Sequence, residues 1–360
     1  MRILVYEHVN GGGFAGRPIP PALSREGLAM LRAVCTDIAK VPGLSAATIL
    51  EPRARAAWDL SEVPAHVADD PGAEPLEDSG AAQLLAALSA DVDGVLLIAP
   101  ELDGALASVS RMVLEAGGRI LGTDPAGVEE AADKLRLPER LGSRSVPCLA
   151  AEPFQQGVTP SFGYPCVVKP RFGAGSSGLI LLRSAADTAA QAPTLERAEL
   201  IATPYHAGLP ASALAMVGPR GTLVLRAGEQ LIAGDGNFAY AGGVLPLPPP
   251  LERRARRLAL RALGSCPRLL GFAGVDLMLD VSGADPPRDL VVEVNPRLTT
   301  SYVGLRALSL SNLAEHWIRI LHGEHPADPV WRAGRVRFTP DGGTSFEDSE
   351  ERRERREPAT

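Results

Sequence analysis

The sequence has few aromatic residues and no excess of basic charge. Only 4% of its 360 residues are Phe, Trp or Tyr, which leaves few flat side chains on which nucleic-acid bases could stack. The formal net charge is −7 at pH 7 and the isoelectric point is near 5.5, whereas a general nucleic-acid binder needs a basic face. These two shortages exclude nucleic acid as the expected partner.

Long hydrophobic runs and cysteine motifs are also missing. No uninterrupted apolar run approaches the roughly 18 residues of a membrane span. Only four apolar residues stand between Arg2 and Glu7, which is too few for a secretion signal. The four cysteines are widely scattered, with no metal-binding spacing: Cys35, Cys148, Cys166 and Cys266. We therefore expect a soluble, cytoplasmic protein with reduced thiols and no membrane partner.

Apolar runs alternate with helical patterns through the first third of the chain. The runs at 2–9 and 94–99 are typical of buried strands, and helices are predicted at 24–39 and 102–116. This alternation predicts a doubly wound parallel sheet. Ligands bind beyond the carboxyl ends of the strands in such sheets, so the loop at 10–16 and the residues Pro100-Glu101 should lie at one rim.

The loop after the first strand contains a glycine pattern that could bind a dinucleotide. Gly11, Gly13 and Gly16 fit GxGxxG. Three prolines follow at positions 18, 20 and 21, where that fingerprint requires a helix to begin. A flexible loop over a neighbouring site is therefore favoured, and a dinucleotide-dependent oxidoreductase is the distant alternative.

Two predicted strands near the C-terminus carry oxygen-bearing side chains. Glu293 and Asn295 alternate with apolar residues in LVVEVN, so both should point to the same side of the strand. Asp276 lies within GVDLML, where a carboxylate is costly unless it is paired or binds a metal. If these strands pair, the three side chains can converge on Mg²⁺. Arg297 follows directly and could contact phosphate. The alternative is an edge strand with solvated polar residues.

The segment PRFGAGSSGL, residues 170–179, is rich in glycine and serine. Backbone N–H groups of such a loop can surround phosphate oxygens. The loop joins two predicted strands and lacks a GKS or GKT ending, so it is not a P-loop. Lys169 stands at the end of the preceding strand, where its ammonium group could reach a phosphate. A plain hairpin loop with a solvated lysine is the alternative.

Four segments in this order resemble the ATP-grasp superfamily: DK at 133–134 in a predicted helix at 127–137, VVKP at 167–170 with its glycine loop, GVDLML at 274–279, and EVNPR at 293–297. The resemblance implies an ATP-grasp fold, of mixed α/β and α+β class, behind an N-terminal parallel-sheet domain. It implies domains at 1–125 (α/β), 126–206 (lid) and 207–330 (metal and ATP binding). The charged segment 341–360 is predicted to be disordered.

The resemblance also implies roles for single residues, with ATP and Mg²⁺ (or Mn²⁺) as cofactors. Lys134 and Lys169 would hold the nucleotide phosphates, and Arg297 would stabilise the transferred phosphoryl group. Metal would be bound by Asp276, Glu293 and Asn295. The loop closing over the phosphates would use Gly173, Gly175, Ser176, Ser177 and Gly178. The hinge beside adenine would use Ala202, Thr203 and Tyr205, although Thr203-Pro204 replaces the usual Gln/Glu pair.

Within the superfamily, the segments EVNPRLTTSYVGLR at 293–306 and LVYEHVNGGG at 4–13 are most similar to the tyramine–glutamate ligases of methylofuran-type cofactor biosynthesis. The resemblance implies that ATP activates the γ-carboxylate of glutamate and that the amine of tyramine attacks it. It also allows a homodimer. Residues 299–302 are candidates for lining the substrate pocket, with a capped helix start as the alternative, and Arg297 or Arg306 could bind the α-carboxylate. Other amino-acid or peptide ligases, and a non-catalytic nucleotide-binding regulator, remain alternatives.

Overall fold

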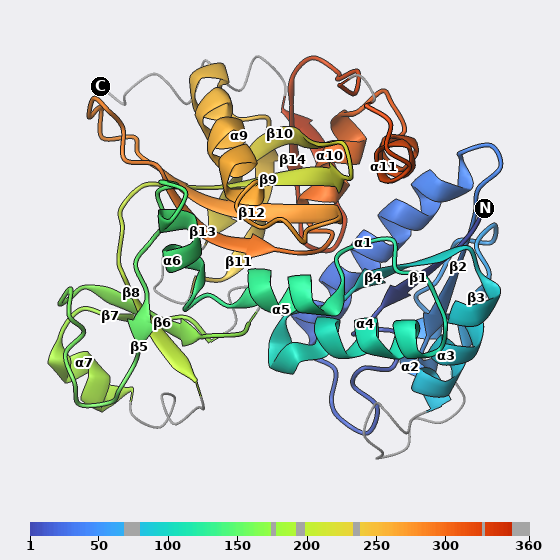
Figure 1. The fold of residues 1–360 in the computed structure, drawn as a ribbon, viewed down its shortest axis with the longest axis horizontal. Coiled ribbons are helices and arrows are strands. Elements are labelled where there is room, and N and C mark those ends of the chain that lie inside the picture. Colours follow the sequence, from blue (N-terminus) through green and yellow to red (C-terminus); the bar gives the residue numbers. More distant parts are fainter. Residues whose placement is uncertain (68–79, 174–177, 192–198, 233–237, 326–327, 348–360) are drawn as a thin grey trace.

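The computed structural model describes residues 1–67, 80–173, 178–191, 199–232, 238–325 and 328–347. Its strands form three sheets (Figure 1). The N-terminal sheet, drawn in blue, lies on one side of the molecule, and a small green sheet lies on the other. A larger sheet, coloured yellow to orange, lies between and above them. Among the described helices, none is long and apolar enough to span a bilayer.

The N-terminal sheet contains four parallel strands in the order β3-β2-β1-β4. Helices cover both of its faces, so alternate residues of β1 enter two different cores: Ile3 and Val5 in one, Leu4 and Tyr6 in the other. This confirms the predicted parallel sheet. The elements are β1 (Arg2–Glu7), α1 (Pro21–Ala39), β2 (Ser45–Leu50), α2 (Pro52–Arg55), β3 (Ala65–Val67), α3 (Gly80–Asp91), β4 (Gly94–Ile98), the 3₁₀ helix η2 (Leu102–Gly104) and α4 (Ala105–Glu115).

The green sheet is small and antiparallel, in the order β5-β8-β6-β7. It has its own core, formed by Cys166, Val168, Leu182, Leu200 and Ala202. Two helices lead into it from the N-terminal sheet. The elements are α5 (Pro125–Ala132), α6 (Leu137–Gly142), β5 (Glu152–Pro153), β6 (Cys166–Pro170), β7 (Ile180–Leu182), α7 (Ala185–Ala190) and β8 (Leu200–Pro204).

The third sheet has the order β13-β12-β9-β10-β11-β14-β15 and is antiparallel throughout. Helix α9 packs on one face, and α10 and α11 pack on the other. The elements are β9 (Leu209–Gly218), β10 (Gly221–Ile232), β11 (Tyr240–Leu245), α9 (Pro249–Leu263), β12 (Gly271–Leu279), β13 (Leu290–Asn295), α10 (Ser301–Leu308), α11 (Leu313–Leu321), β14 (Arg335–Phe338) and β15 (Thr344–Glu347).

The start of the predicted disordered tail is wrong in the structure. Residues 344–347 form β15, which pairs with β14 through Phe338↔Thr344 and Val336↔Phe346. In β14, Val336 and Phe338 point inward and alternate with two arginines. This strand gives β15 a partner, which the charge content of the tail does not reveal. The rest of that segment, 348–360, lies outside the described residues.

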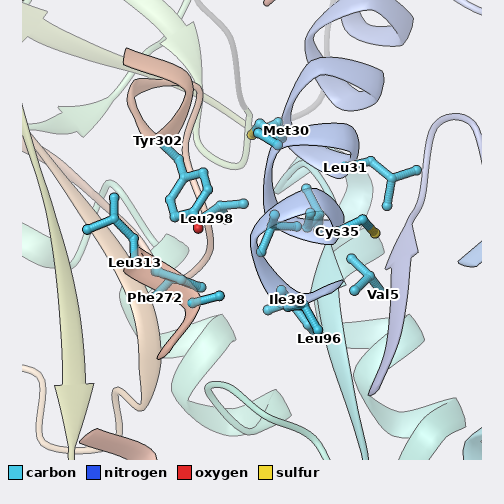
Figure 2. Packing of buried hydrophobic residues seen from close by; sticks show 14 of the residues in the cluster. Val5, Met30, Leu31, Cys35, Ile38, Leu96, Phe272, Leu298, Tyr302 and Leu313 are labelled. Atoms are coloured by element: carbon cyan, nitrogen blue, oxygen red, sulfur yellow. The ribbon is translucent and has the colours of Figure 1, made fainter. Parts of the chain in front are cut away.

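One continuous core joins the N-terminal sheet to the C-terminal sheet. Leu31, Cys35 and Ile38 of α1 pack in the same cluster as Phe272 of β12 and Tyr302 of α10 (Figure 2). The Phe272 ring is in edge contact with Tyr302, at 5.6 Å between centroids. The apolar surface buried in this cluster fixes the two sheets against each other. The carboxyl ends of β1 and β4 are therefore held close to the end of β13.

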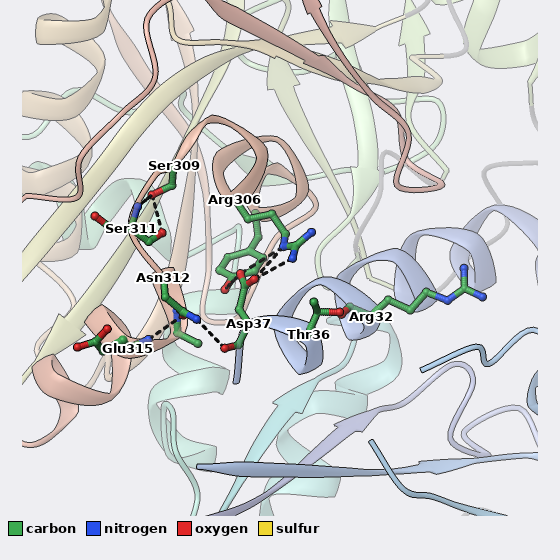
Figure 3. Close-up of polar contacts among 10 residues, drawn as sticks. Arg32, Thr36, Asp37, Arg306, Ser309, Ser311, Asn312 and Glu315 are labelled. Carbon is green, nitrogen blue, oxygen red and sulfur yellow. Dashed lines mark hydrogen bonds and ion pairs between the residues drawn. The ribbon is translucent and has the colours of Figure 1, made fainter. Parts of the chain in front are cut away.

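A polar network reinforces this junction (Figure 3). The carboxylate of Asp37, at the end of α1, accepts hydrogen bonds from the Tyr302 hydroxyl (2.8 Å) and from Arg306 Nη2 (2.8 Å). The Asp37 carbonyl accepts from Asn312 Nδ2 at 2.7 Å, and Asn312 also caps α11. Asp37 and Tyr302 are buried, so their polar groups need hydrogen-bond partners within the protein. This network supplies them.

Candidate active site

Strands β12 and β13 bring the three predicted metal ligands together. The register pairs Asp276 with Glu293 and Gly274 with Asn295. Asn295 Nδ2 donates to Asp276 Oδ2 at 3.2 Å, and Gln230 Nε2 from β10 donates to Asp276 Oδ1 at 2.9 Å. A Cβ on Gly274 would lie 2.5 Å from Thr299 Cγ2, so glycine is needed here to let the loop after β13 fold back.

The two carboxylates at this centre have opposite electrostatic surroundings. Burial, and then the negative charge of Glu293, raise the pKa of Asp276. Burial also acts to raise the pKa of Glu293, but the ammonium groups of Lys134 and Lys169 lower it overall. Two adjacent carboxylates, a neutral amide and two ammonium groups thus meet at one point. Such a centre is suited to hold a divalent cation bound to phosphate.

The two predicted phosphate-binding lysines lie on this centre. Lys134 Nζ lies 3.4 Å from Glu293 Oε2 and donates to the Gly173 carbonyl at 2.7 Å. Lys169 is the second-last residue of β6 and has 5% of its surface exposed. Burial lowers its pKa, although the negative charge of Glu293 opposes this. The predicted helix over 127–137 is wrong at its end, because α5 stops at Ala132 and Asp133 has extended backbone angles. This break directs Lys134 to the centre.

An elongated cavity of about 160 Å³ extends from these lysines between the small sheet and the C-terminal sheet. Its lining combines charged groups with apolar side chains, among them Leu149, Val167, Ile232 and Met278. Of the predicted nucleotide residues, Lys134, Lys169, Gly173, Thr203 and Tyr205 line it. Ammonium groups suit a triphosphate and apolar side chains suit a base.

Four predicted loop residues and one hinge residue are not among the residues that line this cavity. Gly175, Ser176 and Ser177 lie outside the described residues, and Gly178 is in a turn at φ 76° beside the cavity-lining Leu179. The side chain of Ala202 is fully buried in the small sheet's core, so its predicted place in the hinge would involve its main chain only. It is in the middle of β8, whose alternation turns Ala202 inward and Thr203 toward the cavity.

A second cavity, of about 110 Å³, opens on the other side of the same carboxylates. Gln230, Tyr240, Asp276 and Glu293 line both cavities, so the two meet at the metal-ligand candidates. The second cavity is closed by the rim of the N-terminal sheet, through Glu7 and Ala99, and by α1, through Glu26. We call it the substrate cavity and the first one the nucleotide cavity.

Arg297 lines the substrate cavity but is already paired. Its Nε and Nη2 donate to the two oxygens of Glu101, at 3.0 and 2.9 Å, and its Nη1 donates to the Leu298 carbonyl. Sequence reasoning placed Glu101 at the rim without giving it a role. This bidentate pair fixes the guanidinium plane and leaves two of its N–H groups for a ligand. Arg297 therefore connects the rim of the N-terminal sheet to the end of β13.

The residues after β13 divide between the substrate cavity and the core. Thr299, Thr300 and Ser301 line the cavity, as their position suggests. The prediction for Tyr302 is wrong, because its ring is completely buried and its hydroxyl is bonded to Asp37. Arg306 is bound to Asp37 in the junction with α1 and does not line the cavity, so the structure does not place it at a substrate carboxylate (Figure 3).

The glycine loop after β1 is compact rather than flexible. A Cβ on Gly13 would lie 2.2 Å from the His8 ring, and Gly11 and Gly12 are buried. Helix α1 begins at Pro21, five residues after the last glycine of GxGxxG, so the dinucleotide geometry is not formed. The loop instead surrounds the Glu7 carboxylate, which accepts hydrogen bonds from Val9 N, Asn10 N and Asn10 Nδ2.

Glu7 and Glu26 are two carboxylates of the substrate cavity that sequence reasoning missed. Glu7 is 1% exposed, and burial raises its pKa to about 7 against the effect of its hydrogen bonds. Burial also raises the pKa of Glu26, while Arg297 and Arg25 act to lower it. Glu7 could have been found, because it ends the first strand at the rim where ligands bind. Glu26 gives no such signal.

Two family models match the chain. Residues 131–301 match the ATP-grasp domain, and residues 50–128 match the pre ATP-grasp 3 domain. The tertiary structure resembles a protein from Archaeoglobus fulgidus assigned to the ATP-grasp superfamily, with 21% identity, a TM-score of 0.67, and coverage of 94% of this chain and 92% of that one. No functionally curated protein matches the sequence significantly.

Other solved structures with this fold have a stated activity. A biotin carboxylase–β,γ-ATP complex from Campylobacter jejuni is 13% identical, with a TM-score of 0.68 over 93% of this chain and 74% of that chain. An L-amino acid ligase from Bacillus licheniformis is 14% identical, with a TM-score of 0.60 over 91% and 75%. At such identities the likeness shows the fold alone. The two family matches, which together cover more than half of the chain, establish that the protein belongs to the ATP-grasp superfamily of ligases.

Proposed function

We propose that this protein is an ATP-dependent carboxylate–amine ligase that works through an acyl-phosphate intermediate. The observation that carries the proposal is the meeting of two cavities at Asp276 and Glu293. One cavity is lined by the ammonium groups and apolar side chains that suit a nucleotide, and the other has polar groups suited to small substrates. A phosphoryl group can pass between two such sites without entering water.

The chain's own residues suit the nucleotide and its metal. Lys134 and Lys169 would hold the phosphates, and Gly173 begins the loop that would cover them. Asp276, Glu293 and Asn295 offer hard oxygen ligands, and the mutual repulsion of the two carboxylates supports a cation between them. No group of three His, Cys, Asp or Glu side chains among the described residues forms a complete metal site, which agrees with magnesium taking its other ligands from phosphate and water. When bound, magnesium would neutralise phosphate charge and align the reacting groups.

Arg297 would act on the substrate side of this centre. Its two remaining N–H groups can contact the carboxylate that receives the phosphoryl group, while Glu101 holds its plane in position. Activation is required because a carboxylate is a poor electrophile, whereas an acyl phosphate has a good leaving group. Thr299, Thr300 and Ser301 add hydroxyl groups around the same substrate.

For the substrates, we propose L-glutamate, activated at its γ-carboxylate, and tyramine as the amine, in methylofuran-type cofactor biosynthesis in the cytoplasm. The support is the similarity of residues 4–13 and 293–306 to tyramine–glutamate ligases, two segments that together form much of the substrate cavity. We further propose that residues 1–125, 126–206 and 207–330 act as the three working units of the enzyme.

The test is ADP release from ATP and Mg²⁺ with L-glutamate, with and without tyramine, followed by mass analysis of the product. We expect ADP formation to depend on the acid and a new amide to appear only when the amine is present. A panel of other amino acids and amines distinguishes the tyramine–glutamate reaction from other amino-acid ligations. Absence of turnover with every acid–amine pair would contradict the ligase proposal and favour a regulatory nucleotide-binding role.

A further inference from the structure

The wall of the substrate cavity opposite the metal strands carries a carboxylate without a partner. Glu26 lies in the first turns of α1, is partly buried and lines the cavity. Within the described part of the chain it makes no hydrogen bond or ion pair. Withdrawing a carboxylate from water without a hydrogen-bond partner costs free energy of folding. A carboxylate of this kind in a cavity wall is therefore better explained by binding a ligand than by stabilising the fold.

Glu7, beside it, is already satisfied. It accepts three hydrogen bonds from the loop that follows β1 and has 1% of its surface exposed. A Cβ on Gly27 would lie 2.5 Å from the Glu7 carboxyl carbon, so α1 packs directly on that carboxylate. This contact fixes the neighbouring Glu26 at the cavity wall, and it makes Glu26, not Glu7, the carboxylate available to a ligand.

The charges around the cavity favour a cationic ligand group. Four carboxylates line it, those of Glu7, Glu26, Asp276 and Glu293. Arg297 is the one arginine or lysine that lines this cavity in the described chain, and it is bound to the buried Glu101. An ammonium group beside Glu26 would give this carboxylate the charged hydrogen-bond partner that it lacks among the described residues.

Two further features indicate what the ligand looks like. Thr300 lines the cavity with 8% of its surface exposed, and its side chain has no hydrogen-bond partner among the described residues. It therefore offers a free hydroxyl to a ligand. On the α1 side, the apolar side chains of Val9, Leu23 and Met30 line the same cavity. The site thus combines a carboxylate and a hydroxyl with an apolar wall, which fits a primary amine with an apolar body.

We propose that Glu26 binds the ammonium group of the acceptor substrate and then accepts a proton from it. This rests on the proposed ligase function. Glu26 takes one proton from R–NH₃⁺, and the neutral nitrogen attacks the acyl-phosphate carbon. The C–N bond forms while the C–O bond to phosphate breaks, and phosphate leaves with the electron pair and takes the second proton. The products are the amide, HPO₄²⁻ and protonated Glu26. Burial, which raises the pKa of Glu26, makes it a better proton acceptor.

The test compares Glu26→Gln and Glu26→Asp with the wild type, and Glu115→Gln on the exposed end of α4 is the matched control. Binding of tyramine is measured by calorimetry on the full chain. Turnover of glutamate is measured with tyramine, which is cationic, and with hydroxylamine, which is neutral at neutral pH and traps an acyl phosphate as a hydroxamate. Removing one charge-assisted hydrogen bond predicts about 10- to 100-fold weaker tyramine binding in Glu26→Gln, with partial recovery in Glu26→Asp.

The turnover arm adds a readout that misfolding would not give. Glu26→Gln should lose far more of its amide formation with tyramine than of its hydroxamate formation. Equal tyramine binding by wild type and Glu26→Gln, or no binding by either, would overturn the assignment of Glu26. Equal loss of hydroxamate and amide would also overturn it. If wild type forms no ADP and no hydroxamate, the ligase proposal fails, whereas the binding measurement still decides the role of Glu26.

Discussion

The nucleotide cavity and the substrate cavity share one wall, but they are built in different ways. The nucleotide cavity is lined by residues between Lys134 and Glu293, from two antiparallel sheets and the segments that connect them, and its charged residues lie in short motifs. The substrate cavity also needs β1, α1 and the end of β4, which lie far from β13 in the chain. The charged residues of the first can be found from local motifs, whereas the second exists only because a long-range core holds the N-terminal sheet against the C-terminal sheet.

Loss of the shared wall should have the largest effect and should not distinguish the two cavities. Glu293→Gln removes the negative charge that faces both Lys134 and Lys169. We expect ADP formation to fall by about 100- to 1,000-fold with any acid. Asp285→Asn, on the exposed turn between β12 and β13, is the control. Wild-type activity in Glu293→Gln would remove the basis of the proposed metal centre.

Glu7 should make the stability of the wall that β1 contributes to the substrate cavity depend on pH. Its pKa is raised from 4.5 to about 7, so its contribution to folding is fully present below pH 4.5 and is lost as the pH rises through about 7. Between pH 5 and 8 the wild type should lose about 2 to 3 kcal/mol of unfolding free energy through this group. Glu7→Gln should not show this loss.

The measurement is denaturant unfolding of wild type and Glu7→Gln at several pH values. The difference between the two unfolding free energies should change in favour of the variant as the pH rises. A constant difference across the range would mean that Glu7 ionises normally, and that the loop from Val9 to Gly13 admits water.

The nucleotide cavity can be tested separately through Lys169. Lys169→Met removes the buried ammonium at the end of β6 while keeping a similar length of side chain. We expect the KM for ATP to rise about 10- to 100-fold, because a charge-assisted contact to phosphate is lost. The KM values for the acid and amine should change little. An equal rise for all three substrates would show that the cavities are not independent.

The same division explains what could be predicted from the sequence. Strand alternation places Glu293 and Asn295 together, and the register with Asp276 follows from pairing two adjacent strands. By contrast, Arg297 looks free in the sequence because its partner Glu101 lies 196 residues away. Arg306 looks free because Asp37 lies 269 residues away. The lining role of Glu26 depends on how α1 packs, which no local pattern encodes.

The smallest effect should come from Tyr302, and it sharpens the comparison most. Tyr302→Phe keeps the buried ring against Phe272 but removes the hydroxyl that donates to Asp37. Asp37 keeps Arg306 as a partner, so the expected loss is about 1 to 2 kcal/mol of unfolding free energy. Denaturant unfolding measures it, with the exposed Tyr205 changed to Phe as the control.

The kinetic consequence of Tyr302→Phe should be confined to one cavity. Because α10 begins at Ser301, a looser contact with α1 would move Thr300 and Glu26 relative to each other. The KM for the amine should then rise by a few-fold, while the KM for ATP stays the same. If the ATP value changes and the amine value does not, the α1–α10 junction does not set the substrate cavity, and the contrast between a locally encoded site and one assembled at long range is wrong.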